Sequence, residues 1–143
     1  MVNSVLAIHL LMALYMIGLI WFVQIVHYPL MAVVGADAFV NYEQQHTYRT
    51  SFVTAPMMLV ELGTAVWLLW QIPHDRTFWS ANLLLIALIW ASTFFVQVPL
   101  HQQLSQKFDE RLVQKLVQTN WIRTVLWTGK GIGLLVVLYY RWR

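Results

Sequence analysis

The chain has 143 residues, of which 59% are hydrophobic and only 10% are charged, and its formal net charge is +3. This composition leaves too little polar surface to cover a water-soluble globule, so the protein must use lipid as its solvent. The nine lysines and arginines form no basic run, which excludes nucleic acid as a partner, and the absence of cysteine excludes disulfides, thiolate metal ligands and thiol nucleophiles.

Four long apolar stretches predict four transmembrane helices, each close to the ~20 residues that a helix needs to cross the hydrocarbon. The first stretch has no preceding Lys or Arg and no small-x-small cleavage site, so we interpret it as a retained anchor. Four spans place both termini on one side, called side A, and the first and third connections on the other, called side B. The stretches run approximately from Val5 to Val26, Phe52 to Gln71, Trp79 to Leu100 and Trp121 to Tyr140.

The first and third connections are predicted to be interfacial amphipathic helices. In the first, from Asp37 to Arg49, the side chains of Phe39, Glu43 and His46 fall on one stripe at about 100° per residue. If this helix continues into the second span, polar groups run from the interface to mid-membrane. In the third connection apolar residues repeat every four positions, which is typical of a helix on the membrane surface: Leu104, Phe108, Leu112 and Leu116.

An internal repeat divides the chain into two tandem helical hairpins, residues 1–72 and 73–143. Phe-Val-Gln ends the first span at residues 22–24 and the third at 95–97, and a histidine follows each, His27 or His101. Arg-Thr-x-x-x-Thr begins the second span at Arg49 and the fourth at Arg123. These matches lie 73 or 74 residues apart, so we expect two copies of one hairpin, related by an axis along the membrane normal.

The repeat predicts that its shared polar positions meet on side B. This follows because the first and third spans run in the same direction through the membrane. The predicted cluster contains Gln24, His27, His46, Arg49, Thr50 and Thr54 from one hairpin, with Gln97, His101, Asn120, Arg123, Thr124 and Thr128 from the other.

Glu61 lies halfway along the second span, where an acidic side chain is costly unless it is protonated, paired or hydrated. Its predicted partner is Lys130 in the fourth span. Counted from the repeat positions, the two residues are offset by about 7 Å along the helices, a gap that a lysine side chain can nearly close. We interpret these intramembrane charges either as an ion pair that holds the bundle or as a proton-handling or substrate-binding site.

Glu43 and His46 have the i, i+3 spacing that places a carboxylate and an imidazole on one metal ion in helical bundles. With His27 and His101 on the same side, a single site of three imidazoles and one carboxylate would suit copper, iron or zinc. Such bundles use two of these motifs and this chain has one. The alternative is therefore that the interfacial histidines only hydrogen-bond and cap.

Haem is a separate possibility near side A. His9, Met12 and Met16 share part of one face of the first span, and both residue types are axial haem ligands. However, His9 is a full membrane thickness from the side B histidines, and methionines at helical spacing are typical of packing. We therefore expect either no cofactor or one transition metal, with haem as the less favoured alternative.

The third span running into Val98-Pro99-Leu100, an amphipathic segment and then Asn120-x-x-Arg123-Thr124 resembles the anthrone oxygenase-like family of small integral membrane proteins. That family carries Pro-Leu-Asn and Trp-Asn-x-x-Arg-Thr patterns at these places, whereas this chain has His101 and Thr119 in place of the usual Asn and Trp. The front half agrees through Gly18 and residues 36–40. Fungal members oxidise polycyclic anthrones to anthraquinones with dioxygen, so the resemblance implies oxygen chemistry on an apolar aromatic substrate and supports Asn120, Arg123 and Thr124 as site residues.

An oxidase of this kind needs a base and a group that stabilises an enolate. His46 or His101 is the candidate base, and Arg49 with Arg123 are the candidate anion stabilisers. The alternative for both arginines is structural, holding the loop helices through carboxylates.

The function that we expect is therefore a membrane-embedded oxidoreductase, anthrone oxygenase-like, acting on a small lipophilic aromatic or quinone-like substrate at the His/Arg/Asn cluster. Two alternatives stay open: a non-enzymatic proton- or ion-conducting or accessory subunit that uses the polar stripe from Glu43 to Glu61, and a haem- or metal-binding membrane protein. The expected location is the bacterial cytoplasmic membrane. The lipid bilayer is the expected partner, and the sequence leaves a homo-oligomer open.

Overall fold

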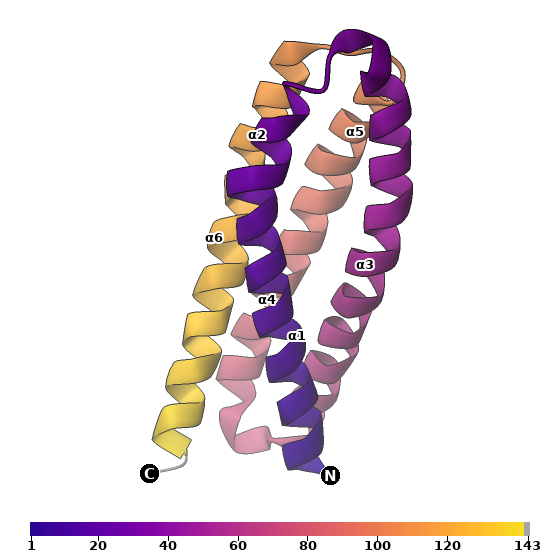
Figure 1. Ribbon diagram of the computed structural model, residues 1–143. Helices are drawn as coiled ribbons and strands as arrows, with labels where there is room; N and C mark the ends of the chain where they lie inside the picture. The colour runs from indigo at the N-terminus through magenta and orange to yellow at the C-terminus, as the bar shows by residue number, and fades with distance from the viewer. Residues whose placement is uncertain (142–143) are drawn as a thin grey trace.

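The computed structural model describes residues 1–141 as a bundle of four long helical rods (Figure 1). Each rod is long and apolar enough to cross a membrane, which confirms the predicted all-α integral membrane four-helix bundle. The N-terminus and the described end of the last helix lie at the same end of the bundle, as expected for side A. The rods comprise α1 (Val2–Phe22), η1 (Val23–His27) and α2 (Tyr28–Met31); α3 (Ala36–Gln71); η2 (Pro73–Asp75), α4 (Arg76–Ser92), η3 (Thr93–Gln97) and α5 (Val98–Leu104); and α6 (Glu110–Arg141).

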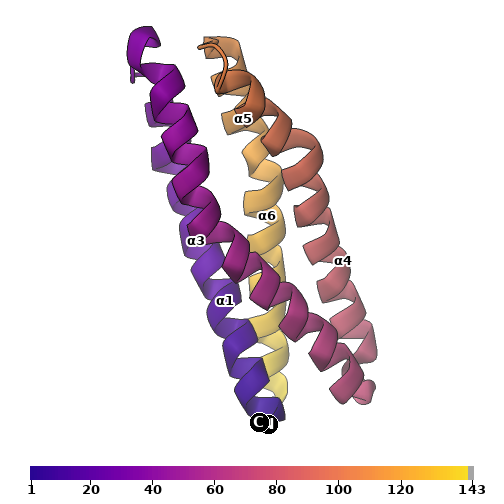
Figure 2. The ribbon, with the colours of Figure 1, turned by 90° about the vertical axis from the view of Figure 1, so that its right-hand side faces the viewer.

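The rods pack in the order α1, α3, α4 and α6 around the bundle. Helix α1 contacts α3 and α6, and α4 contacts the same two helices, so α3 and α6 lie on one diagonal. Helix α3 lies close to α4 at side A and diverges from the α4–α5 rod toward side B (Figure 2). This divergence sets where a cavity can form.

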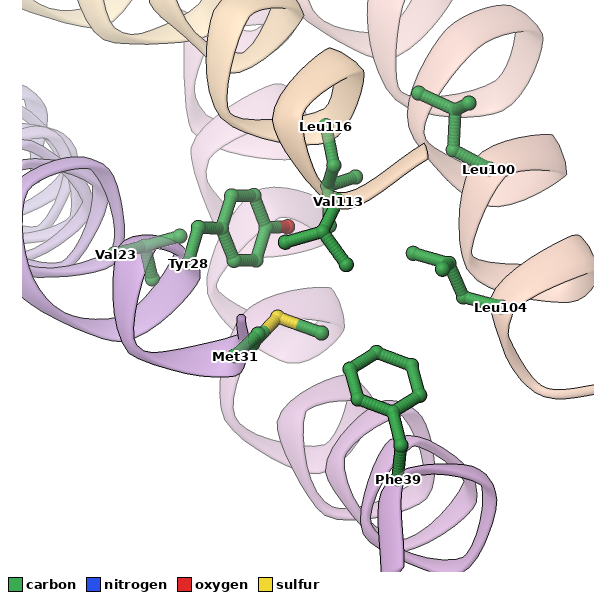
Figure 3. Close-up of a cluster of buried hydrophobic side chains, with 8 residues drawn as sticks. All are labelled: Val23, Tyr28, Met31, Phe39, Leu100, Leu104, Val113 and Leu116. Atoms are coloured by element: carbon green, nitrogen blue, oxygen red, sulfur yellow. The ribbon is translucent and has the colours of Figure 1, made fainter. Parts of the chain in front are cut away.

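Apolar side chains fill the bundle interior in three successive clusters. The side B cluster joins Met31, Phe39 and Leu104, each fully buried, and these side chains are directed toward one another between the helices (Figure 3). The middle cluster includes Met16 and Trp127, and a third cluster lies near side A. Large apolar residues also cover the outside of the rods. This arrangement suits lipid on the outer surface.

The first connection predicted as an interfacial helix is helical, whereas the third is interrupted, because residues 105–109 between α5 and α6 form turns and irregular structure; neither connection is a separate helix. Residues 36–49 are the first turns of α3, and residues 110–116 are the first turns of α6. No helix breaker interrupts them, and at about 1.5 Å per residue both helices exceed the roughly 30 Å of hydrocarbon, so they extend beyond it. Leu104 and Leu116 are fully buried in the side B cluster. The four-residue apolar repeat therefore faces the protein core and not the membrane surface.

A proline follows a π-helical turn in the first rod and again in the third. The π turns η1 and η3 end two residues before Pro29 and Pro99. Proline has no N–H and its ring clashes with the carbonyl four residues earlier, and the wider turn relieves this clash. Each π turn adds one residue to the rod, which shifts the following side chains by about 100°. Tyr28 and His101 are carried inward by these shifted segments.

The turn from α2 into α3 depends on Gly35. Its φ angle is +84°, the only positive φ within residues 1–141. A side chain would be strained in this conformation, whereas glycine adopts it readily. The turn directs α3 back along α1 and so places Glu43 and His46 beside the end of the third rod.

Candidate functional site

A cavity of about 590 Å³ lies between the four rods toward side B. Its apolar walls include Met16, Met58 and Trp127. Its exposed rim residues come from α3 and α5 and include Ser51 and Gln102, so the cavity opens between these two diverging helices. The volume is within the range of small-molecule binding sites, roughly 300–1,000 Å³.

Arg123 of α6 lines the cavity and is the cation of its polar wall. Its Nε donates to Asn120 Oδ1 at 3.0 Å, while Nη2 donates to Gln97 Oε1 at 3.3 Å and to Tyr28 Oη at 3.2 Å. The side chain is buried, and no carboxylate pairs with it anywhere in residues 1–141. Because its partners are amide and phenol groups and not carboxylates, this buried cation favours an anionic group placed beside it.

Tyr28 connects Arg123 to a buried imidazole and carboxylate. Its hydroxyl lies 2.9 Å from His101 Nε2, and His101 Nδ1 lies 2.5 Å from Glu43 Oε1. Glu43 is fully buried, and its Oε2 makes no hydrogen bond to any part of the chain that the structure describes. These four side chains, one from each rod, form a continuous polar chain from Arg123 to Glu43. Oε2 of Glu43 is left without a partner among residues 1–141.

His46 lies next to this chain and also lines the cavity. Its Nδ1 is 2.8 Å from His27 Nε2 and 3.1 Å from Thr50 Oγ1, and its ring centroid is 5.3 Å from that of His101. One ligand atom from each of Glu43, His46 and His101 lies within 4.8 Å of the others. The carboxylate and two of the predicted metal-ligating imidazoles are therefore together, while His27 contacts His46 from outside this group.

The structure separates the two predicted arginines. Arg49 is exposed, donates to Gln45 Oε1 at 3.4 Å and does not line the cavity. Arg123 lines it. Asn120 is buried behind Arg123, where its Oδ1 accepts the guanidinium and its Nδ2 donates to Gln24. Asn120 therefore positions Arg123 and has no contact with the cavity itself.

Gln24 joins the first rod to α6 through side-chain hydrogen bonds. Its Oε1 accepts hydrogen bonds from Asn120 Nδ2 at 2.9 Å and from Thr124 Oγ1 at 3.3 Å, and its Nε2 donates to the Val117 carbonyl at 3.1 Å. All the side chains in this contact are buried. This polar contact holds the wall of the cavity that carries Arg123.

Glu61 and Lys130 form a buried ion pair across the diagonal of the bundle. Trp127 adds a second donor, because its Nε1 lies 3.2 Å from Glu61 Oε2. The sequence identified the two charges but not the tryptophan. Trp127 also lines the cavity, so the ion pair lies directly behind the cavity wall.

His9 lies far from this cluster, in the side A part of the bundle. Its Nδ1 is 2.9 Å from Thr64 Oγ1, and its ring packs edge-on against Trp79 with centroids 5.4 Å apart. The ring is fully buried among helices and is not part of the cavity wall. Tight packing at this position does not fit a haem group, which needs a pocket of its own beside the axial ligand.

Tyr28 was not among the sequence candidates, although it connects the two ends of the polar chain. One signal points to it: Tyr28 precedes His101 by 73 residues, the spacing of the repeat. The histidine match, His27 with His101, uses a spacing of 74 and so does not point to Tyr28.

No family model, curated protein or solved structure matches this chain. The function is therefore argued from the geometry of the site.

Proposed function

We propose that this protein is a membrane-embedded oxidoreductase that acts on a small lipophilic aromatic or quinone-like substrate bound in the cavity between its helices. One observation supports this proposal above the others: the same cavity has an apolar wall and a wall of imidazole, phenol and guanidinium groups. An aromatic ring with one polar end matches both walls. Lipophilic substrates also concentrate in the bilayer that surrounds the rods.

The apolar wall suits the ring system of such a substrate. Met16 and Met58 offer thioether sulfurs, which make favourable contacts with aromatic rings, and Trp127 offers an aromatic surface. The polar end of the substrate then lies near His46 and Arg123, the groups on the opposite wall. The opening between α3 and α5 is the entry path.

The histidines suit the removal of a proton from an acidic carbon or a phenol. His46 faces the cavity, and its contact with the half-buried His27 offers a path by which the proton reaches water. The Arg123 guanidinium stabilises the enolate or phenolate left behind. Nη1 of Arg123 makes no hydrogen bond within residues 1–141, so a donor remains for the substrate.

Dioxygen is the proposed oxidant. In an anthrone-type substrate the methylene opposite the carbonyl in the central ring loses two hydrogens and gains one oxygen atom, and the second oxygen atom leaves as water. In a quinol, two electrons and two protons pass to dioxygen and hydrogen peroxide forms. The resemblance to the anthrone oxygenase-like family supports the first case. The proposed location is the bacterial cytoplasmic membrane.

Oxygen uptake by the purified protein in lipid nanodiscs tests the proposal. Anthrone and menadiol are the two substrates, and empty nanodiscs measure their spontaneous oxidation. We expect the protein to accelerate one of them and Arg123→Lys to lower that rate by about 100-fold, because an ammonium group cannot keep the contacts of Nε and Nη2 and also offer the substrate a donor at the position of Nη1. Arg111→Lys, an exposed arginine earlier on the same helix, is the matched control and keeps the rate.

The outcomes separate the possible sites. No acceleration of either substrate over empty nanodiscs contradicts the oxidoreductase proposal. An equal loss of rate in Arg49→Lys would assign the first repeat arginine to the site as well and contradict the cavity assignment.

A proton-conducting function is a second candidate, supported by the buried polar groups that continue below the cavity. The ion pair of Glu61 and Lys130 lies behind Trp127, and His9 Nε2 and both polar atoms of the Asn82 side chain lack partners within the described chain. Water could link such groups across the bundle. Proton flux into liposomes distinguishes the candidates: a conductor loses flux in Glu61→Gln, whereas an oxidoreductase shows no flux at all.

A further inference from the structure

We propose that Glu43, His46 and His101 bind one divalent first-row transition-metal ion at the side B wall of the cavity. The proposal rests on the proposed function and deepens it, because the ion would lie where the substrate's polar end is expected; with the ion bound, His46 is a ligand and no longer the base. It rests on ligand type, ligand proximity and an unpartnered buried oxygen, each of which is independent of the substrate.

The ligand set suits such an ion. Two imidazoles and one carboxylate are the protein ligands of non-haem iron oxygenases and of catalytic zinc sites, which leave the remaining coordination positions open. In this protein one ligand atom from each residue already lies within 4.8 Å of the other two. Donor atoms that share an ion lie roughly 3–4 Å apart, since each bond is about 2.0–2.2 Å long. Side-chain rotations alone can close the difference.

Glu43 supplies the observation that points most directly to a ligand. The side chain is fully buried, and its Oε2 has no partner among residues 1–141. Buried carboxylate oxygens are almost always hydrogen-bonded or bound to a cation. The other oxygen faces His101 Nδ1, so an ion placed here would satisfy the carboxylate and replace that direct contact.

Neighbouring side chains orient both imidazoles for this role. Ligating histidines usually bond through the second ring nitrogen to a nearby acceptor, which fixes the ring. His46 Nδ1 contacts His27 and Thr50, which leaves Nε2 for the ion, and His101 Nε2 contacts the Tyr28 hydroxyl, which leaves Nδ1. His27 is therefore assigned to the outer shell and not to the ligand set.

The proposed metal site borders the cavity. His46 and His101 both line the cavity wall, so open coordination positions would face a bound substrate. A redox-active ion there would supply dioxygen binding and electron transfer. Arg123 lies on the same wall and would hold the substrate anion beside the ion.

Cobalt titration of the chelator-treated full-length protein in mild detergent tests the site. We expect visible ligand-field absorption that saturates at one cobalt per chain. Glu43→Gln, His46→Gln and His101→Gln should each weaken binding by more than about 100-fold, and His27→Gln by about 10- to 100-fold, as for other outer-shell partners. His74→Gln, which changes an exposed histidine at side A, is the matched control and keeps the affinity.

A measurement on the unmutated protein tests the metal site without depending on whether the variants fold. Pulsed electron paramagnetic resonance of the copper-loaded chain should detect two coordinated imidazoles. Absence of saturable cobalt binding, or binding that survives in both Glu43→Gln and His46→Gln, would overturn the site. Oxidation that depends on Arg123 but resists chelation would overturn the metal site and leave the proposed function standing, whereas cobalt bound by all three ligands in a protein without turnover would do the reverse.

Discussion

The hydroxyl of Tyr28 lies 2.9 Å from Nε2 of His101, and these two residues are 73 positions apart in the chain. The repeat predicted from the sequence includes this spacing, so it pairs the two positions. The polar chain takes Tyr28 and Glu43 from residues 1–72 and His101 and Arg123 from residues 73–143, so it joins the two halves of the chain.

Replacing this tyrosine tests the polar chain. Tyr28→Phe removes the hydroxyl between His101 and Arg123, and both are left short of one partner. We expect a loss of about 1–3 kcal/mol in the free energy of unfolding, measured by denaturant titration in mixed micelles. Tyr48→Phe changes a tyrosine that is 64% exposed and should stay within about 0.5 kcal/mol. Equal stability of the two variants would show that the hydroxyl is not buried in this contact.

The diagonal ion pair predicts a strong non-additive effect. Glu61→Gln leaves the Lys130 ammonium buried without a counter-charge and should destabilise the bundle by about 3–5 kcal/mol. Adding Lys130→Met to Glu61→Gln should restore most of this loss, because no unpaired charge then remains. Thermal unfolding of the single and double variants gives the coupling free energy. Glu110→Gln, at an exposed carboxylate, is the control, and additive losses would contradict the pairing.

Filling the cavity should abolish ligand binding without unfolding the protein. Thr54 lines the cavity, and within the described part of the chain its hydroxyl bonds only to the Thr50 carbonyl in the preceding turn, so Thr54→Phe adds bulk and loses one local bond. We expect menadione binding, followed by tryptophan fluorescence quenching, to weaken by at least about 10-fold, or ~1.4 kcal/mol. Val53→Phe adds a similar bulk at a neighbouring residue that is 42% exposed and should bind normally. Similar affinities in the two variants would place the ligand elsewhere.

The π turn in the third rod predicts an unusual tolerance of deletion. Removing Phe94 from η3 together with Pro99→Ala should convert the turn to regular α-helix and keep both flanking faces in place. Removing Leu84 from α4 instead should rotate every later residue of the rod by about 100° and separate His101 from Glu43. Size-exclusion chromatography and helicity of the two deletions compare them directly. A monodisperse Leu84 deletion with an unfolded Phe94 deletion would contradict this account.

The sequence was sufficient for the four spans, and it named Lys130 as the candidate partner of Glu61 and placed His46 and His101 in one cluster. These features follow from apolar length, from the cost of a buried charge and from the repeat. Apolar periodicity could not show that residues 36–49 and the second span form one helix, because the same pattern fits a separate surface helix and the first turns of a longer one. The repeat also treated Arg49 and Arg123 as equal. Their burial differs because Asn120 and Gln97 hold the second, while the first turns outward toward Gln45.

The hydrogen bonds of Gln24 to Asn120 and Thr124 have no equivalent at the matching positions of the predicted repeat. At the repeat spacings of 73 and 74 residues, Gln24 corresponds to Gln97, and Asn120 and Thr124 correspond to His46 and Thr50. Hydrogen bonds join the first set between the first rod and α6, whereas Gln97 makes no hydrogen bond to His46 or Thr50 within residues 1–141, although all three line the cavity. The predicted repeat offers this polar contact twice, and in the structure one copy of it joins the first rod to α6. The corresponding contact of Gln97 with His46 and Thr50 is not formed, and the cavity lies there instead. We expect a mutation that forms this contact to raise the free energy of unfolding and to abolish binding in the cavity.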